Sequence, residues 1–102
     1  MRATITTHDG KQLTAARALA SLGIRELAAA AGITPRTLHR LENGGVVHVS
    51  EKKRHGHVRR AVWERIMAAL AIAGVELLAE GGSFGAGVRW TEPRERRDSR
   101  GA

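Results

Sequence analysis

The sequence predicts one small, mainly α-helical domain of four to five helices followed by a small C-terminal β-hairpin. Three observations predict this fold class. The chain has 102 residues, which is about the size of a single small domain. Apolar residues recur at helical spacing through much of residues 1–74,. Alternating apolar and polar residues then flank a glycine-rich stretch, which is typical of a hairpin. We therefore expect a helical domain over residues 1–74, a hairpin over 75–90 and a disordered tail over 91–102.

The first two helices are predicted from their apolar residues and their ends. The first is expected from about Thr7 to Ser21, with Thr7 or Asp9 as its cap, because such side chains accept hydrogen bonds from the free N–H groups of a helix start. Its expected buried residues are Leu13, Ala16, Leu19 and Ala20. The second helix is expected from about Ile24 to Ala30.

A tight turn and a third helix follow. Gly32 is expected to take a positive φ angle in the turn, because glycine does so without strain. Thr34 is a good helix cap, and Pro35 suits the first helical position. The third helix should end at Asn43, before two glycines,. Residues 24–43 are therefore predicted to form a helix-turn-helix.

The remainder of the chain is predicted to hold a loop, a helix and the hairpin. Residues 46–57 are basic and polar without a helical period, so we expect an irregular connection. A fourth helix is expected over 58–73, with an apolar face formed by Val58, Val62, Ile66, Ala69, Leu70 and Ala73,. Residues 75–77 and 88–90 alternate as strands do. The stretch 81–87 lacks the lysine and hydroxyl of a phosphate-binding loop and is expected to be a turn.

Charge and composition restrict the class of partner. The chain carries 17 basic and 10 acidic residues, a net charge of +7. Residues 1–62 hold 11 of the basic and 4 of the acidic residues, so the excess is concentrated. A small domain of this kind is expected to bind nucleic acid in preference to a membrane surface.

Other classes of protein are excluded by what the sequence lacks. There is no cysteine, hence no disulfide and no thiolate metal site. No apolar run approaches the roughly 18 residues that a membrane span needs, and no signal peptide is recognisable. We expect a cytoplasmic, nucleoid-associated protein that is not an enzyme and has no cofactor, because no catalytic set of side chains has a supporting context.

The third helix is the expected DNA-contacting element. Its spacing buries Leu38 and Leu41 with Leu27 and Ile33, while Ala28 allows the second helix to approach closely. The exposed residues are then Pro35, Arg36, Thr37, His39 and Arg40. This polar and basic face is suited to the major groove of DNA.

Residues 17–44, RALASLGIRELAAAAGITPRTLHRLENG, resemble the Xre/Cro-like helix-turn-helix family of phage repressors and bacterial regulators. The match is without gaps in this segment and extends loosely through the fourth helix. The resemblance implies a partly buried structural salt bridge between Arg17 and Glu42.

The same resemblance implies DNA contacts. Arg36, Thr37 and Arg40 are expected to face base edges, with His39 on the same face, and Thr34 and Asn43 to hold phosphates. The chain departs from the family at Gly23 and Ile24, where relatives have a Ser or Thr cap and a Gln, and at Pro35. These departures shift the expected contacts onto the remaining residues of the third helix.

The densest basic run follows the helix-turn-helix. It consists of Lys52, Lys53, Arg54, Arg59 and Arg60. We expect these residues to contact DNA phosphates, as a backbone clamp or a minor-groove arm. The alternative is a flexible, solvated loop.

Histidines and tryptophans near these segments have simpler interpretations. His48, His55 and His57 lack cysteine or carboxylate partners, so we expect no metal site and, instead, added charge beside phosphate when protonated. Trp63 and Trp90 are expected in the core or hairpin, and Trp90 equally at a subunit interface.

The sequence therefore predicts a double-stranded DNA-binding transcriptional regulator. We expect a dimeric repressor that binds a palindromic operator, with the hairpin either pairing with a second subunit or packing on the fourth helix. The alternative is an antitoxin or anti-activator that acts mainly through a protein partner. A nonspecific architectural protein is a third possibility.

Overall fold

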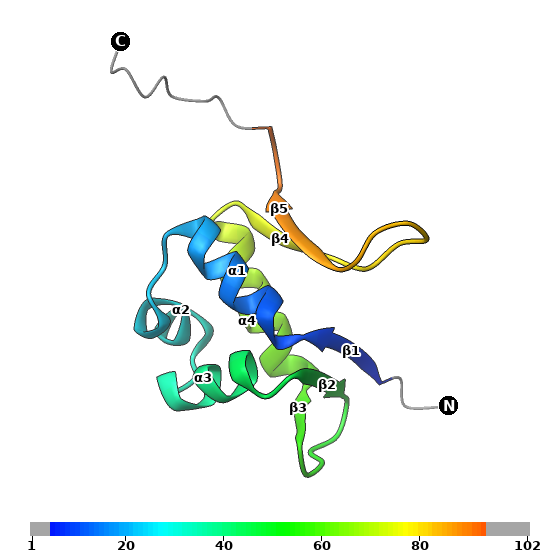
Figure 1. Ribbon diagram of the computed structural model, residues 1–102. Coiled ribbons are helices and arrows are strands. Elements are labelled where there is room, and N and C mark those ends of the chain that lie inside the picture. Colours follow the sequence, from blue (N-terminus) through cyan, green and yellow to red (C-terminus); the bar gives the residue numbers. More distant parts are fainter. Residues whose placement is uncertain (1–4, 94–102) are drawn as a thin grey trace.

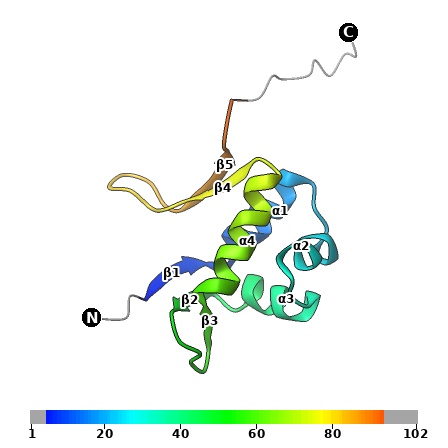
Figure 2. The same cartoon turned by 180° about the vertical axis from the view of Figure 1, so that it is seen from behind.

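The computed structural model describes residues 5–93, which contain four helices and two small sheets (Figure 1). The helices are α1 (Gly10–Ala20), α2 (Ile24–Ala31), α3 (Pro35–Asn43) and α4 (Arg60–Ile72). The strands are β1 (Thr6–Asp9), β2 (Val46–Ser50), β3 (His57–Arg59), β4 (Val75–Leu78) and β5 (Gly87–Trp90). About 46% of the described residues are helical, which agrees with the predicted mainly helical class. Figure 2 shows α4 in front of α1, with α2 and α3 on one side.

The prediction for the first helix was wrong at its start. Residues 6–9 form β1, which pairs antiparallel with β2, and α1 begins only at Gly10. The cap is Asp9, one of the two alternatives: its carboxylate accepts a hydrogen bond from the Lys11 N–H at 2.9 Å. The side chain of Gln12 in turn accepts from the Asp9 N–H at 3.2 Å. This reciprocal capping box fixes the helix start after the strand.

The predicted irregular connection over 46–57 was also wrong. Residues 46–50 form β2, the central strand of the sheet β1-β2-β3, and only residues 51–56 form a loop. Val47 and Val49 point into the core, whereas Val46 is exposed. The sequence therefore contained buried residues at every second position, as is typical of a strand. β3 pairs parallel with β2. It contains Val58 and Arg59, which were predicted to belong to the fourth helix, whereas α4 begins only at Arg60.

The helix-turn-helix matches its prediction closely. Gly32 has a φ angle of +69° at the end of α2, as the turn requires. The carbonyl of Ala31 accepts a hydrogen bond from Arg65 Nε of α4 at 2.9 Å. The turn is therefore held by α4 as well as by its own glycine.

The hairpin of β4 and β5 lies on the helices. Val75 is buried, and Leu77, Val88 and Trp90 pack against the core that α1 and α4 share with the rest of the domain. The buried Gln12 side chain of α1 donates hydrogen bonds to the carbonyls of Leu78 and Gly87, at 2.9 and 3.1 Å. One amide thus ties both strands to α1, while the tip of the hairpin projects from the body (Figure 1).

The C-terminal end of the chain was predicted to be disordered from residue 91. Thr91 instead continues the hairpin, because its N–H donates to the carbonyl of Gly74 at 2.8 Å. The rest of that prediction falls mainly on residues 94–102, which lie outside the described residues.

Close contact between α1 and the end of α3 completes the core. A Cβ atom at Gly10 would overlap the carbonyl oxygen of Leu41 and lie 2.9 Å from that of Glu42. The N–H of Gly10 donates to the carbonyl of Gly45 at 2.8 Å. The absence of a side chain at Gly10 therefore sets how closely α3 can approach α1. The largest fully buried side chains are Leu13, Leu27, Leu38, Val49, Ile66, Leu70 and Val75.

Candidate nucleic-acid interface

Helix α3 presents the predicted polar face to solvent because its opposite face is anchored in the core. Leu38 is fully buried and Glu42 is 3% exposed. These two residues are one turn apart and fix the rotation of the helix about its axis. The exposed residues of α3 are Arg36, His39, Arg40 and Asn43, and Thr37 is half-buried.

The N-terminus of α3 is held by the hydroxyl of Thr34. Its Oγ1 accepts a hydrogen bond from the N–H of Thr37 at 3.1 Å and donates to Thr37 Oγ1 at 2.9 Å. A hydroxyl that accepts one bond still has its own proton to donate. The Thr34 hydroxyl, which was predicted to contact a phosphate, is therefore engaged in capping the helix. The Thr37 hydroxyl still has its proton to donate to a ligand. Asn43 Nδ2 donates to the carbonyl of His39 at 2.9 Å.

The ion pair implied by the resemblance is present at the base of α3. Arg17 Nε lies 2.6 Å from Glu42 Oε2, and Arg17 Nη2 lies 2.8 Å from Glu42 Oε1. Thr14 donates a further hydrogen bond to Glu42 at 2.9 Å. Burial by itself raises the pKa of Glu42, but the hydrogen bonds from Arg17 and Thr14 and the positive charge of Arg17 outweigh it, so the pKa is lowered. Hydrogen bonding to Glu42 correspondingly raises the pKa of Arg17.

The loop between β2 and β3, residues 51–56, is braced by hydrogen bonds. Ser50 Oγ donates to the carbonyl of Lys52 at 2.9 Å, and His57 Nδ1 lies 3.3 Å from Ser50 Oγ. The N–H of His57 donates to the carbonyl of Arg54 at 2.9 Å. The His57 ring also stacks on His48, with 5.1 Å between ring centroids. These contacts tie the two ends of the basic loop, Ser50 and His57, to its own backbone.

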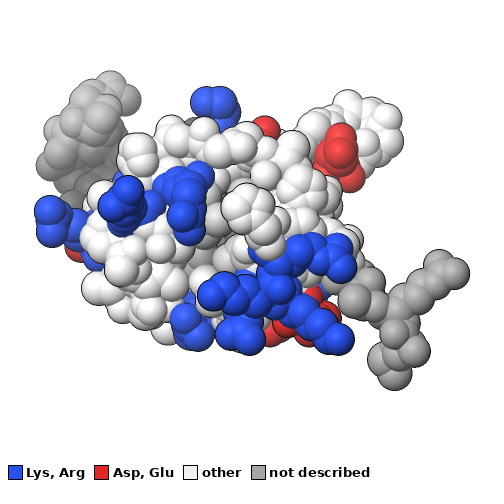
Figure 3. Space-filling model, turned by 90° about the horizontal axis from the view of Figure 1, so that it is seen from below, with Lys and Arg blue, Asp and Glu red and all other residues white. Residues whose placement is uncertain are grey.

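The residues of the predicted basic run do not all have the same surroundings. Lys52, Lys53, Arg54 and Arg59 are exposed. Arg60 is only 26% exposed and forms an ion pair with Glu51, so its charge is compensated within the protein. Figure 3 shows the Lys and Arg side chains gathered on the face where α3 and the β2–β3 loop lie. The exposed members of the run and the exposed residues of α3 thus share one face.

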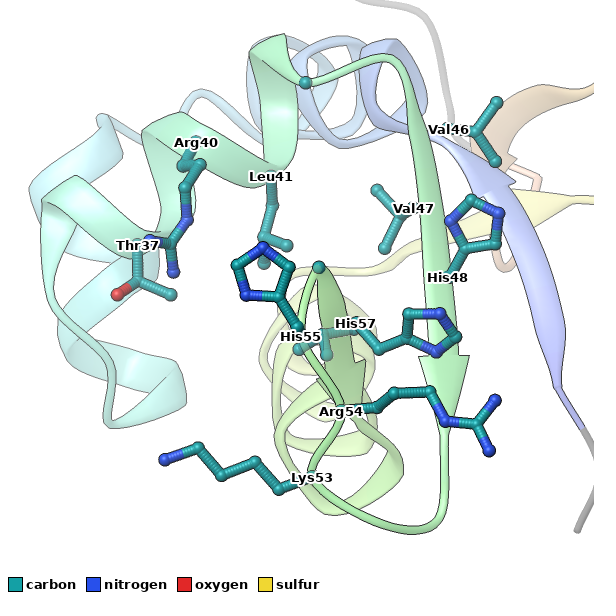
Figure 4. Close-up of a pocket in the computed structure, with 13 residues that line it drawn as sticks. Thr37, Arg40, Leu41, Val46, Val47, His48, Lys53, Arg54, His55 and His57 are labelled. Atoms are coloured by element: carbon teal, nitrogen blue, oxygen red, sulfur yellow. The ribbon is translucent and has the colours of Figure 1, made fainter.

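A hollow of about 730 Å³ separates α3 from the β2–β3 loop. Thr37 and Arg40 of α3 lie on one side of it, and His55 and Lys53 on the side of the loop (Figure 4). The Lys53 side chain extends toward α3, whereas Arg54 extends to the opposite side of the loop (Figure 4). Arg36 does not line the hollow. The fold therefore divides the predicted contacts into those beside the hollow and those outside it.

The three histidines predicted to add charge lie around the same hollow. Partial burial, followed by the positive charges of His48 and Arg54, lowers the pKa of His57. Among residues 5–93, no group of three or more histidine, cysteine, aspartate or glutamate side chains is placed to hold a metal ion.

Two contributors to this interface were missed by sequence reasoning. Thr14 supports Glu42, and Ser50 braces the loop. For Ser50 a signal existed, since it ends the alternation of Val47 and Val49 and precedes a polar turn. Nothing in the sequence near Thr14 indicates its partner, because Glu42 lies 28 residues away.

Comparison with known proteins agrees with this geometry. The sequence model of a family described as a helix-turn-helix domain matches residues 10–80, which is more than half of the chain. A search among curated proteins gave no match. In the described part of the chain, no helix has the length and apolar character that a membrane crossing requires.

Proposed function

Because this chain belongs to the helix-turn-helix domain family, which is typical of Xre/Cro-like regulators, we propose that it is a sequence-specific regulator of transcription. It binds double-stranded DNA, places α3 in the major groove and acts as a repressor, without catalytic activity of its own. The observation that carries this proposal is the basic, exposed face of α3, which Leu38 and Glu42 hold outward from the core.

The residues proposed to contact bases are Arg36, Thr37, His39 and Arg40. The N-terminal part of a recognition helix is the part that usually meets base edges, which favours Arg36 as the main determinant of sequence. Lys52, Lys53, Arg54 and Arg59 then contact phosphates, together with the Asn43 amide, whereas the Thr34 hydroxyl is engaged in capping α3. Arg60 contributes less to this set because it is paired with Glu51.

Selection of binding sites from random duplexes tests the sequence specificity. We expect one recurring half-site. Substitution Arg36→Ala should weaken binding to the selected duplex by about 2 kcal/mol, within the range of a bidentate arginine–guanine contact, and leave binding to a scrambled duplex nearly unchanged. Arg89→Ala, which removes the same charge from the hairpin, is the matched control. Equal weakening on both duplexes would assign Arg36 to a phosphate, and selection without a preferred sequence would favour an architectural protein.

The proposed repressor acts as a homodimer on a palindromic operator. A single recognition helix contacts few base pairs, and two-fold pairing doubles the site. The hairpin remains the candidate interface, since β4 and β5 form a two-stranded sheet of their own within residues 5–93. Sedimentation equilibrium, together with two-fold symmetry of the selected sites, tests this proposal. Removing the hairpin is an unsuitable test because it would expose the core around the buried Val75.

A second candidate function is action through a protein partner, as in an antitoxin or anti-activator. Two large apolar side chains favour it: Ile72 is 89% exposed and Phe84 is 63% exposed. A stable complex purified with the full chain, lost in Phe84→Ser and kept in Arg36→Ala, would support this alternative.

A further inference from the structure

The hollow between α3 and the β2–β3 loop has walls and a floor of different chemistry. Arg40 and Thr37 stand on one wall, and Lys53 and His55 on the other (Figure 4). Between them lie apolar side chains that include Leu41, Val46, Val47 and Val58. Val47 and Val58 are almost completely buried, so this part of the floor belongs to the core, whereas Val46 is exposed at its edge.

The electrostatics of the hollow favour an anion. None of the residues that line it is acidic, and Arg40, Lys53 and Arg54 all belong to its lining. The two acidic residues nearest in sequence, Glu42 and Glu51, each form an ion pair with an arginine that does not line the hollow. Their charges are therefore compensated elsewhere, and the positive charge of the walls is not cancelled locally.

The occupant should combine anionic groups with apolar surface in an extended shape. A sugar–phosphate strand does so, since its phosphates carry the charge and the carbon atoms of its deoxyribose rings suit an apolar floor. A recognition helix in the major groove lies beside the strand that borders this groove. An element on the far side of that strand would approach it from the minor groove, as basic arms do.

We propose that one sugar–phosphate strand of the duplex lies in this hollow, between α3 and the β2–β3 loop. Arg40 and the Thr37 hydroxyl contact it from the major-groove side, and Lys53 and His55 from the minor-groove side. This inference rests on the proposed function, from which it takes its ligand, duplex DNA. It also assigns Arg40 and Thr37, both proposed above to contact bases, to the backbone, which leaves base contacts mainly to Arg36, one helical turn before Arg40 and outside the hollow.

The first experiment needs no knowledge of the operator. Binding of a fluorescein-labelled duplex of arbitrary sequence is measured by anisotropy over a series of salt concentrations. The slope of log K against log salt is negative, and each lost phosphate contact decreases its magnitude by about 0.9. We expect this decrease for Arg40→Ala and for Lys53→Ala, and no decrease for Arg89→Ala, which removes the same charge from the hairpin. An unchanged slope for either Arg40→Ala or Lys53→Ala would overturn the proposal.

The second experiment locates the contacts on the selected duplex. Single neutral methylphosphonates are placed at each phosphate in turn, and the cost of each is compared between the wild type and the variants. Arg40→Ala and Lys53→Ala should lose sensitivity at the same or neighbouring phosphates of one strand. Arg89→Ala is the matched control because Arg89 lies on β5 and does not line the hollow, so it should keep that sensitivity.

The two experiments separate the inference from the function on which it depends. Loss of sensitivity at phosphates of opposite strands would show that α3 and the loop span a groove, and this would overturn the proposal even for a sequence-specific regulator. If selection recovers no preferred site, sequence specificity fails and the salt slopes alone decide the inference. Thermal unfolding of each variant checks that the fold is intact, as expected for residues that are exposed.

Discussion

Helix α3 and the β2–β3 loop carry basic side chains to the same face of the molecule, but they are held there by different forces. The core fixes α3 through Leu38, the Arg17–Glu42 ion pair and the close contact at Gly10. The loop is fixed by hydrogen bonds of Ser50 and His57 near the surface. Substitutions that remove the contacts of α3 with the core should therefore lower the stability of the fold. Substitutions that remove the hydrogen bonds of the loop should mainly lower the affinity for DNA.

The largest effect is expected from Gly10→Ala. The new methyl group would overlap the Leu41 carbonyl, and backbone atoms on both sides leave little room to relax. We expect a loss of about 3 kcal/mol in the free energy of unfolding, at the upper end for overpacking. Urea unfolding followed by circular dichroism measures it. Gly82→Ala is the control, because a Cβ atom there meets nothing within 4 Å. Equal stability of the two variants would show that α3 does not depend on this contact.

A smaller loss is expected from Glu42→Gln. It leaves the guanidinium of Arg17 without its charge partner in a site where the Glu42 side chain is 2% exposed and that of Arg17 is 19% exposed. We expect about 2 kcal/mol, less than for a fully buried pair because Arg17 reaches solvent. Glu51→Gln breaks the exposed pair with Arg60 and should cost less than about 0.5 kcal/mol.

The pH dependence of stability sharpens this prediction. The pKa of Glu42 is lower in the folded chain than its ordinary value of 4.5. The carboxylate therefore stabilises the fold above that value, and the contribution is lost as the pH falls through the lowered pKa. The difference in unfolding free energy between the wild type and Glu42→Gln should shrink as the pH falls below 4.5. A difference that stays constant down to about pH 2 would contradict the lowered pKa.

An effect on stability smaller than that of Glu42→Gln is expected from Ser50→Ala. It removes the hydroxyl that donates to the Lys52 carbonyl and contacts His57. We expect about 1 kcal/mol or less in stability and a several-fold loss of affinity for duplex DNA, because the loop is then less well ordered before binding. Anisotropy titration and thermal unfolding of the same samples give both values. Stability loss without any loss of affinity would show that the loop shape is unimportant for binding.

The accuracy of the sequence-based predictions differed between the same two regions. The boundaries of α2 and α3 followed from Gly32, Thr34 and Pro35, because turns and caps are determined by neighbouring residues. The strands β1 and β2 were missed, although Val47 and Val49 alternate correctly. A strand of four or five residues gains its stability from its partners, and β1, one of the two partners of β2, lies some 40 residues earlier in the sequence, at residues 6–9.

Local chemistry alone determined the helix-turn-helix, its caps and the basic character of residues 52–60, since each depends on residues close together in the chain. Only the tertiary structure decided which of these charges act together. It compensated Arg60 with Glu51, turned Lys53 toward α3 and Arg54 away, and left Arg36 outside the hollow that Arg40 lines. The physical reason is that the direction of a side chain follows from strand pairing and packing between distant segments, which spacing along one chain does not specify.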